Sequence, residues 1–570
     1  MKTHPIHVIR YRAYGLLMLI AFLLPLVIAE RSWSSNLGEL GTVDFPTSAR
    51  SKEAQAHFMR GVAALHSFWY PVALEEFQEA TRIEPDFMMG YWGEAMAHNH
   101  PIWGDPQETE AARKVLGKVK ITPALSARER AYLQAVKLLY GEGDKRTRDK
   151  AYAAAMDEIH QAYPNDLEAA AFHALALLGT VHADDPAALR TRMYAGALAQ
   201  EVYRKAPNHP GGAHYIIHAF DDPDHAILAL PAARRYAGIA PAAHHALHMP
   251  AHIFLQLGMW AEAVASNEAS WAASDRWVRE HNLSIAERDT HSLHWLLYVS
   301  LQQGRFTKAQ EVLALMRVSL AEFPKDDMLD LFYGMYAERS MAAAYVVATQ
   351  QWDAAETILS PAHAVELKAT DGAGSSDQAS AGLVRTPTIF ARGLAAAMKG
   401  SPAAQTSMAE LARIRSEVAG KDLPFNTRMD HVLEIQELEI DAAARAAKKD
   451  FNEAIEKMRK AAALVEGMPP PSGPPPLIKP VHELFGEILL LAGQPKEAAQ
   501  QFATSLYLHP DRAHSLLGAA RAAAQQDQVD AAAKDYAKLV KQWRQADAEM
   551  PALIEARTYL SKANERRAEK

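Results

Sequence analysis

The chain contains no cysteine among its 570 residues. This absence excludes disulfides, thiolate metal sites, iron–sulfur clusters and cysteine nucleophiles together. It also excludes an anchor of the lipoprotein type, which needs a cysteine at the cleavage point. Any metal site in this protein must therefore lack thiolate ligands, and the available set suits zinc, copper, nickel or iron rather than a metal selected by sulfur.

Several other signatures are missing. The sequence has no Walker-type loop, dinucleotide fingerprint, Gly-x-Ser-x-Gly or His-Glu-x-x-His motif, so no nucleotide cofactor is expected. The net charge is -8 with both signs interleaved, and no basic domain stands out, so nucleic acid is not an expected partner. Hydrophobic residues make up 49% of the chain, while glycine and proline are not in excess. We therefore expect a folded chain with several domains or a repeat array.

The N-terminus has the pattern of an export signal. Lys2, Arg10 and Arg12 precede an apolar run at residues 15–28, which is too short for a comfortable membrane span. We expect cleavage after Ala29, with an uncleaved N-terminal anchor as the alternative. The protein would then be periplasmic or secreted, or anchored to the inner membrane and facing the periplasm. It would touch a membrane only through an uncleaved N-terminal segment.

A period of 34 residues runs through the sequence. At a fixed phase of this period, an alanine is followed by apolar or small residues and then by a proline. The clearest instances are Ala73, Phe77, Ala80 and Pro85; Ala195, Ala199, Val202 and Pro207; Ala229, Ala233, Tyr236 and Pro241; and Ala498, Phe502, Ser505 and Pro510. These residues resemble the tetratricopeptide repeat (TPR), in which small residues let two helices approach and the proline ends the second helix.

The resemblance implies an all-α, TPR-type α-solenoid of about nine helix–turn–helix repeats, similar to exported bacterial TPR proteins of undefined role. The proline-rich stretch predicts a stiff spacer, and the charged C-terminus predicts a polar cap. The expected parts are a signal peptide or anchor (1–29), a linker (30–53), a TPR array (54–467) with a histidine-rich groove at 210–298, a proline-rich spacer (468–480), a C-terminal TPR pair (481–548) and a charged capping helix (549–570).

Eleven of the 25 histidines lie within residues 209–294, and most of them share a repeat phase. We number each repeat from its first helical residue, which is Pro210, His244 or Thr290. The fifth place is then held by His214, His248 and His294, the ninth by His218, His252 and Tyr298, and the second by His245 and His291. Residues four apart lie on one helix face. In the TPR family these places line the concave groove that holds the partner.

The phase of these histidines indicates a metal site, because neutral imidazole is the commonest transition-metal ligand. The metal candidates are His214, His218, His248, His252, His291 and His294, and we expect His245 and Tyr298 to line the ligand groove. Asp221, Asp222 and Glu268 are the candidates for a general base. Pro250, seventh in its repeat, predicts a kink or a helix start between His248 and His252.

Three functions stay open at this point. The first is a periplasmic binding or scaffold protein, whose groove takes a peptide, a protein or a small ligand at a metal-dependent histidine site. The second is a metalloenzyme, a hydrolase or an oxidase, that uses the same histidines around zinc, copper, nickel or iron. The third is a metal-free adaptor between proteins. Tandem duplication of a structural histidine would produce the same phase without a ligand.

Overall fold

The computed structural model describes residues 39–102, 108–123, 125–182, 185–324, 328–360, 375–419, 428–474 and 477–568. The expected signal segment at 1–29 lies outside these ranges. Residues Gly38–Lys570 form one compact unit. No helix among the described residues is both long and apolar enough to cross a membrane.

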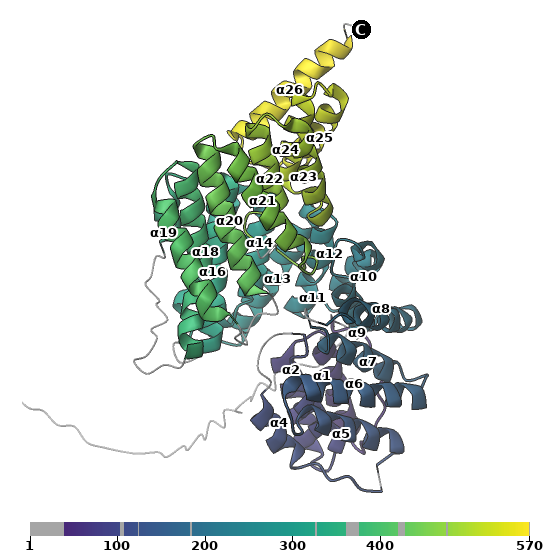
Figure 1. Ribbon diagram of the computed structural model, residues 1–570. Helices are drawn as coiled ribbons and strands as arrows, with labels where there is room; N and C mark the ends of the chain where they lie inside the picture. The colour runs from purple at the N-terminus through teal and green to yellow at the C-terminus, as the bar shows by residue number, and fades with distance from the viewer. Residues whose placement is uncertain are drawn as a thin grey trace, which may run out of the picture. The chain divides into compact units, whose positions relative to one another are not determined.

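The described residues form helices throughout, with no β-strand among them (Figure 1). The helices of the N-terminal half are α1 (Lys52–His66), α2 (Tyr70–Ile83), α3 (Met88–Ala97), α4 (Thr109–Leu116), α5 (Ala127–Leu139), α6 (Lys145–Ala162), α7 (Leu167–Gly179), α8 (Ala188–Lys205), α9 (Pro210–Ala219), α10 (Ala226–Ile239), α11 (His244–His248), α12 (Pro250–Gln256), α13 (Trp260–Glu280) and the 3-10 helix η3 (Ile285–Glu287).

The helices of the C-terminal half follow the same pattern of pairs. They are α14 (Thr290–Gln302), α15 (Phe306–Ala321), α16 (Met328–Thr349), α17 (Ala355–Leu359), α18 (Ser375–Met398), α19 (Ala403–Val418), α20 (Met429–Ala447), α21 (Phe451–Glu466), α22 (Val481–Leu491), α23 (Pro495–Leu508), α24 (Ala513–Gln525), α25 (Val529–Gln542) and α26 (Pro551–Ala568).

Each helix packs mainly on the next helix in the chain, and first helices of successive pairs also touch. Thus α1 contacts α2 and α3, α7 contacts α8 and α9, and α22 contacts α23 and α24. Contacts that are mainly between sequence neighbours are typical of a solenoid. The fold is an all-α TPR-type solenoid, as the repeat pattern predicts.

Glycines explain how closely the helices pack. The ring of Phe77 in α2 lies against Gly61 of α1 and Gly93 of α3, where an added Cβ would come within 2.6 and 2.2 Å of it. Phe502 in α23 lies in the same way between Gly486 and Gly518. Only glycine leaves room for the ring between two helices, because side chains in a core are close-packed. The aromatic residue of the repeat is thus paired with glycines of the flanking helices.

The turn inside several helix pairs contains one residue with a left-handed backbone. Gly258 (φ 65°), Gly304 (φ 67°) and Gly493 (φ 72°) hold this place between α12 and α13, α14 and α15, and α22 and α23. Phe68 holds it between α1 and α2, with φ 53°. A bulky residue is rare in this conformation and marks local strain. The ring of Phe68 is buried beside the histidine site described below.

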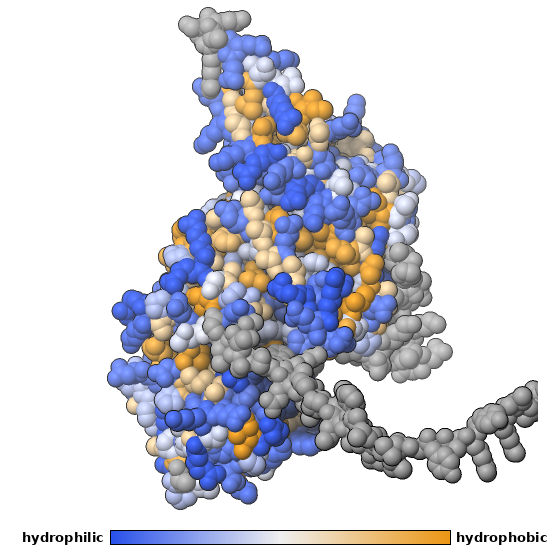
Figure 2. Space-filling view, turned by 180° about the vertical axis from the view of Figure 1, so that it is seen from behind, coloured by the Kyte–Doolittle hydropathy of each residue, from blue (hydrophilic) through white to orange (hydrophobic). Residues whose placement is uncertain are grey.

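The surface is mixed in character. On the face drawn in Figure 2, hydrophobic residues are interspersed with hydrophilic ones. The large exposed hydrophobic side chains are dispersed along the chain, from Ile121 to Ile554. Scattered single apolar residues are normal on a protein surface, so they identify no docking face.

Candidate metal centre

Three helices carry the phased histidines, and they begin where the repeat numbering begins. α9 starts at Pro210, α11 at His244 and α14 at Thr290. Pro250 divides the second of these helices at Met249, which gives α11 and α12. Met249 keeps a right-handed helical backbone (φ -54°, ψ -35°), so the break is a local interruption with no reversal of the chain.

The first triad consists of His214 and His218 from α9 and His245 from α11. The Nε2 atom of His214 lies 3.0 Å from Nε2 of His218 and 3.2 Å from Nε2 of His245. One ligand nitrogen from each of the three residues lies within 4.8 Å of the others. His214 and His245 are buried, and His218 is half-buried. The first triad thus combines the histidines at the fifth and ninth places of one repeat with the histidine at the second place of the next repeat.

The second triad repeats this arrangement one unit further along. It consists of His248 from α11, His252 from α12 and His291 from α14, again with ligand nitrogens within 4.8 Å of one another. The Nε2 atoms of His248 and His252 lie 3.1 Å apart. Two nitrogens bound to one ion at roughly 2.0–2.1 Å lie about 2.9–3.4 Å apart. The spacing within each triad therefore suits one transition-metal ion.

Hydrogen bonds at the other ring nitrogen orient these imidazoles. The Nδ1–H of His214 donates to the backbone carbonyl of His66 (2.7 Å), and that of His252 donates to the Asp221 carboxylate (2.7 Å). The Nδ1–H of His248 donates to the side-chain oxygen of Asn267 (2.8 Å). The amide nitrogen of Asn267 donates in turn to the carbonyl of Ala263. These acceptors place the proton on Nδ1, so in the neutral ring the lone pair of Nε2 points into the triad.

The contact between His248 and His252 is the most informative of these distances. Both rings already use Nδ1 as donor, so two Nε2 lone pairs face each other at 3.1 Å. Two lone pairs at this distance repel unless a cation lies between them. A proton would bridge two nitrogens only, whereas a ring nitrogen of His291 lies within 4.8 Å of both. A metal ion satisfies all three.

Burial keeps most of these imidazoles neutral. It lowers the pKa of His214 to about 3 and the pKa of His291 to about 4. It also holds the pKa values of His218, His245 and His248 well below their ordinary value. Burial alone would raise the pKa of Asp221, but the charge and hydrogen bond of His252 lower it. Imidazole must be neutral to bind a metal, so these five histidines are in the form that binds.

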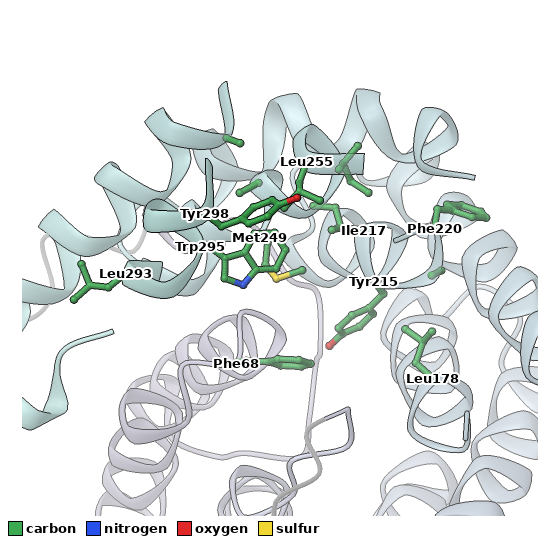
Figure 3. Close-up of a cluster of buried hydrophobic side chains, with 14 of the residues drawn as sticks. Phe68, Leu178, Tyr215, Ile217, Phe220, Met249, Leu255, Leu293, Trp295 and Tyr298 are labelled. Atoms are coloured by element: carbon green, nitrogen blue, oxygen red, sulfur yellow. The ribbon is translucent and has the colours of Figure 1, made fainter. Parts of the chain in front are cut away.

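One aromatic ring packs on each triad. Phe68 is stacked at 5.6 Å from the ring of His245 and lies 4.4 Å from that of His214. Trp295 lies 4.2 Å from the ring of His252. Figure 3 shows Phe68 projecting from the N-terminal helices and Trp295 from the opposite side. The proline-rich segment packs beside the second triad. Gly473 lies against Trp295, and the carbonyl of Pro471 accepts a hydrogen bond from Gln256.

The two triads are close to each other. The rings of His218 and His252 are 6.0 Å apart, and those of His245 and His248 are 6.1 Å apart. The centre is therefore a pair of neighbouring three-histidine sites in one buried region.

A third group of ligand-type residues lies behind the first triad. His66, His209 and Glu168 are buried, and the Glu168 carboxylate accepts hydrogen bonds from His66 (2.7 Å) and His209 (3.1 Å). The remaining ring nitrogen of His66 bonds the Tyr215 hydroxyl, and that of His209 accepts from the backbone of Gly212. Every ring nitrogen has a partner, so this group is a complete hydrogen-bond network that needs no metal.

The structure places the other predicted residues outside the triads. His294 and Tyr298 line a cavity further along α14. Asp222 pairs with Arg192 (3.0 Å) and caps the turn before α10. Glu268 pairs with Lys308 (3.7 Å) and is 44% exposed. Of the three candidates for a base, only Asp221 bonds a triad histidine, and it acts there by orienting His252.

Sequence reasoning did not find five residues that complete the centre. They are His66, Phe68, Asn267, Gln256 and Trp295. His66 and Phe68 come from the first helix pair, 148 residues before His214 in the case of His66. No local spacing connects them with the histidines. Asn267 and Gln256 are ordinary polar residues of helices, and only their hydrogen bonds distinguish them.

No protein-family model and no curated protein sequence matches the chain. Among solved structures, the P58(IPK) TPR domain is 14% identical, with 70% of this chain and 98% of that chain covered and a TM-score of 0.21. A human IFIT1 dimer with m7Gppp-AAAA is 12% identical over 86% of this chain and 90% of that chain, with a TM-score of 0.32. Yeast Tom70 is 10% identical over 91% of this chain and 90% of that chain, with a TM-score of 0.27. At such low values, the chain is similar to these proteins without any implication for its ligand or partner.

Proposed function

We propose that this protein is a metal-binding TPR protein whose two histidine triads hold a pair of transition-metal ions. The observation that carries the proposal is the contact between His248 and His252. Their Nε2 lone pairs face each other at 3.1 Å, and a ring nitrogen of His291 lies within 4.8 Å of both. The equivalent contacts of His214 support a second ion in the first triad.

The ligand set limits which metals fit. Each triad offers three neutral imidazoles and no thiolate, which suits copper, zinc, nickel or iron(II). Calcium and magnesium prefer oxygen ligands and do not fit. The hydrogen bonds at Nδ1 fix the ring orientation, as is usual for histidines that bind a metal.

Elemental analysis of the untagged full-length protein tests the proposal. We expect two equivalents of metal after purification or after loading with zinc or copper followed by dialysis. The double variant His214→Ala, His248→Ala should hold none. Absence of stoichiometric metal in the wild-type protein after loading, with the chain folded by circular dichroism, would refute the proposal.

A matched control separates the triads from the third histidine group. His209→Gln removes a histidine of the hydrogen-bond network around Glu168 and leaves both triads in place. We expect this variant to keep two equivalents of metal. Loss of metal from it would mean that ligands were assigned to the wrong cluster.

A metalloenzyme is the second candidate, and one observation favours it. Three protein ligands leave one coordination position of each ion free, as in catalytic zinc sites, whereas structural sites take four. Cobalt-loaded protein tests this point, because azide binding at a free position changes the visible spectrum. An unchanged spectrum would indicate closed sites and exclude reactions at the metal.

The remaining functional expectations belong to the same proposal. The pattern of Lys2, Arg10, Arg12 and the apolar run supports export, so we propose a periplasmic or secreted location. The TPR-type fold supports a role as a binding or scaffold protein for a peptide, a protein or a small ligand. Fractionation of cells that express the full chain, compared with a chain lacking residues 1–29, tests the location.

A further inference from the structure

Beyond the second triad, one face of α14 lines a cavity. His294, Tyr298 and Gln302 follow at four-residue steps, so they lie on one face of the helix. They line a cavity of about 200 Å³ together with Arg512 and with residues of α16, α20 and the segment before α22. In the repeat numbering His294 and Tyr298 hold the fifth and ninth places. The cavity therefore occupies the place of a third triad, where tyrosine stands instead of histidine.

Tyr298, Gln302 and Arg512 bring hydrogen-bond donors to this cavity that have no acceptor among the described residues. Tyr298 accepts from Arg512 (3.1 Å), and the Gln302 side-chain oxygen accepts from the backbone of Ala513 (3.1 Å). Within the part of the chain that the structure describes, the Tyr298 hydroxyl proton and the Gln302 amide protons have no acceptor. His294 makes no hydrogen bond with any described residue.

Arg512 adds further donor capacity. It is 3% exposed and uses three of its five N–H groups, two on Glu483 and one on Tyr298. Glu483 is shared, because Lys479 also donates to it (3.0 Å). Lys479 also donates to Glu487 (2.7 Å), so both cations have a carboxylate partner, and two N–H groups of Arg512 keep no acceptor among the described residues. Arg512 is the one charged side chain in the cavity wall, since burial lowers the pKa of His294 to about 4 and keeps that ring neutral.

Most of the remaining wall is apolar, apart from the hydroxyls of Tyr336 and Ser340, which are hydrogen-bonded to each other. Leu297, Leu301, Met429, Leu477 and Ile478 contribute hydrocarbon side chains. A ligand that matches this wall has an apolar body and a compact head made of acceptor oxygens. These donors reach the cavity, so the acceptor oxygens of such a head can replace water as their hydrogen-bond partners. A charged acceptor next to a buried arginine makes the strongest of these bonds.

We propose that this cavity binds a small monocarboxylic acid with an aromatic or branched aliphatic body. The carboxylate would accept from Tyr298, Gln302 and Arg512, and the body would lie against the leucine side chains. The site lies on the same helix as His291 of the second triad, but it uses none of the triad residues. It goes beyond metal binding and does not require a bound ion.

Isothermal titration calorimetry on the full-length protein tests the proposal, with benzoate, 3-phenylpropanoate and 4-methylpentanoate as probes. We expect saturable binding of at least one acid, and no binding of the matched alcohol of that acid. Chelator-treated and metal-loaded protein should both bind, so this result is independent of the metal proposal. Lack of saturable binding of all three acids at millimolar concentration overturns the proposal, as does equal binding of acid and alcohol.

Two variants localise the binding. Tyr298→Phe removes one donor and should weaken the affinity by roughly 10-fold. Ala344→Phe fills the cavity and should abolish binding while the metal content stays unchanged. Tyr507→Phe, the same change at a tyrosine that is 62% exposed, should have no effect. Unchanged affinity in a folded Ala344→Phe variant would place the acid elsewhere and overturn the assignment.

Discussion

His218 and His252 stand 34 residues apart in the sequence, at the same place in successive repeats, and their rings are 6.0 Å apart in the fold. Each belongs to a different triad, and each triad takes its third histidine from the following repeat. Because the repeat unit is copied, the site is copied with it. The third copy lacks a histidine at the ninth place, and a cavity takes its place there.

The first prediction compares His245 with His294. His245→Ala should lower the metal content from two equivalents to one, because His245 completes the first triad. His294→Ala should keep two equivalents, because His294 lies in neither triad. Mass spectrometry of the dialysed variants measures both. Loss of metal on changing His294, together with full metal in His245→Ala, would reverse our assignment.

The second prediction concerns Asp221. Removing its carboxylate in Asp221→Ala deletes the hydrogen bond at Nδ1 and frees the ring of His252 to rotate. The affinity of the second triad should fall by roughly 10–100-fold, while that of the first is unchanged. Competition with a chromophoric chelator measures the two affinities.

Asp224→Ala is the control for this change, since Asp224 is exposed and bonds Tyr507 instead of a triad histidine. A similar loss in both variants would show that the effect comes from general charge rather than from the orientation of His252.

The third prediction concerns the strained backbone at Phe68. Phe68→Ala and Phe68→Gly both remove the ring, which should cost about 3–5 kcal/mol of stability. Glycine accepts φ 53° without penalty, so Phe68→Gly should be more stable than Phe68→Ala by about 1 kcal/mol or more. Urea denaturation measures the difference. Equal stability of the two variants would mean that the backbone at residue 68 holds no strain.

The fourth prediction tests the close packing of helices. A Cβ at Gly518 would lie 2.2 Å from the ring of Phe502, so Gly518→Ala should destabilise the fold by about 1–3 kcal/mol. Gly238 lies on the exposed side of α10, with nothing within 4 Å of an added Cβ. Gly238→Ala should stabilise the protein by roughly 0.5–1 kcal/mol, because alanine favours the helix. A loss of stability in both variants would contradict this explanation.

The fifth prediction is a loss of stability in mild acid. Burial lowers the pKa of His173 to about 4 and the pKa of His509 to about 3 in the folded chain, against an ordinary value of about 6.5. At a pH between the folded pKa values and about 6.5, these two histidines bind more protons in the unfolded chain than in the folded one. The free energy of unfolding should therefore fall as the pH drops from about 6.5 to about 4.

Urea titrations of the chelator-treated protein at several pH values measure this slope. His173→Phe removes one of the buried histidines, and its slope should be shallower than that of the wild-type chain. An identical slope in the folded variant would show that His173 takes up no proton on unfolding in this range.

Much of the fold follows from spacing alone. Small residues, aromatic residues and prolines at a fixed phase predict helix pairs, because the period of a helix and the steric limits of its packing are local properties. The starts of α9, α11 and α14 at Pro210, His244 and Thr290 agree with the repeat phase. The phase also puts His214 and His218, or His248 and His252, on one helix face.

Which histidine belongs to which triad depends on the distances between helices. The spacing of residues in the sequence does not specify these distances. His245 faces back toward α9, and His291 faces α11, whereas His294 turns to the cavity. The direction of each lone pair depends on acceptors from other segments: the carbonyl of His66, the carboxylate of Asp221 and the amide of Asn267. Local sequence therefore set the helices and the repeat of the site. Packing across helices set the membership and protonation of each triad, because a ligand site needs nitrogen lone pairs to converge on one point in space.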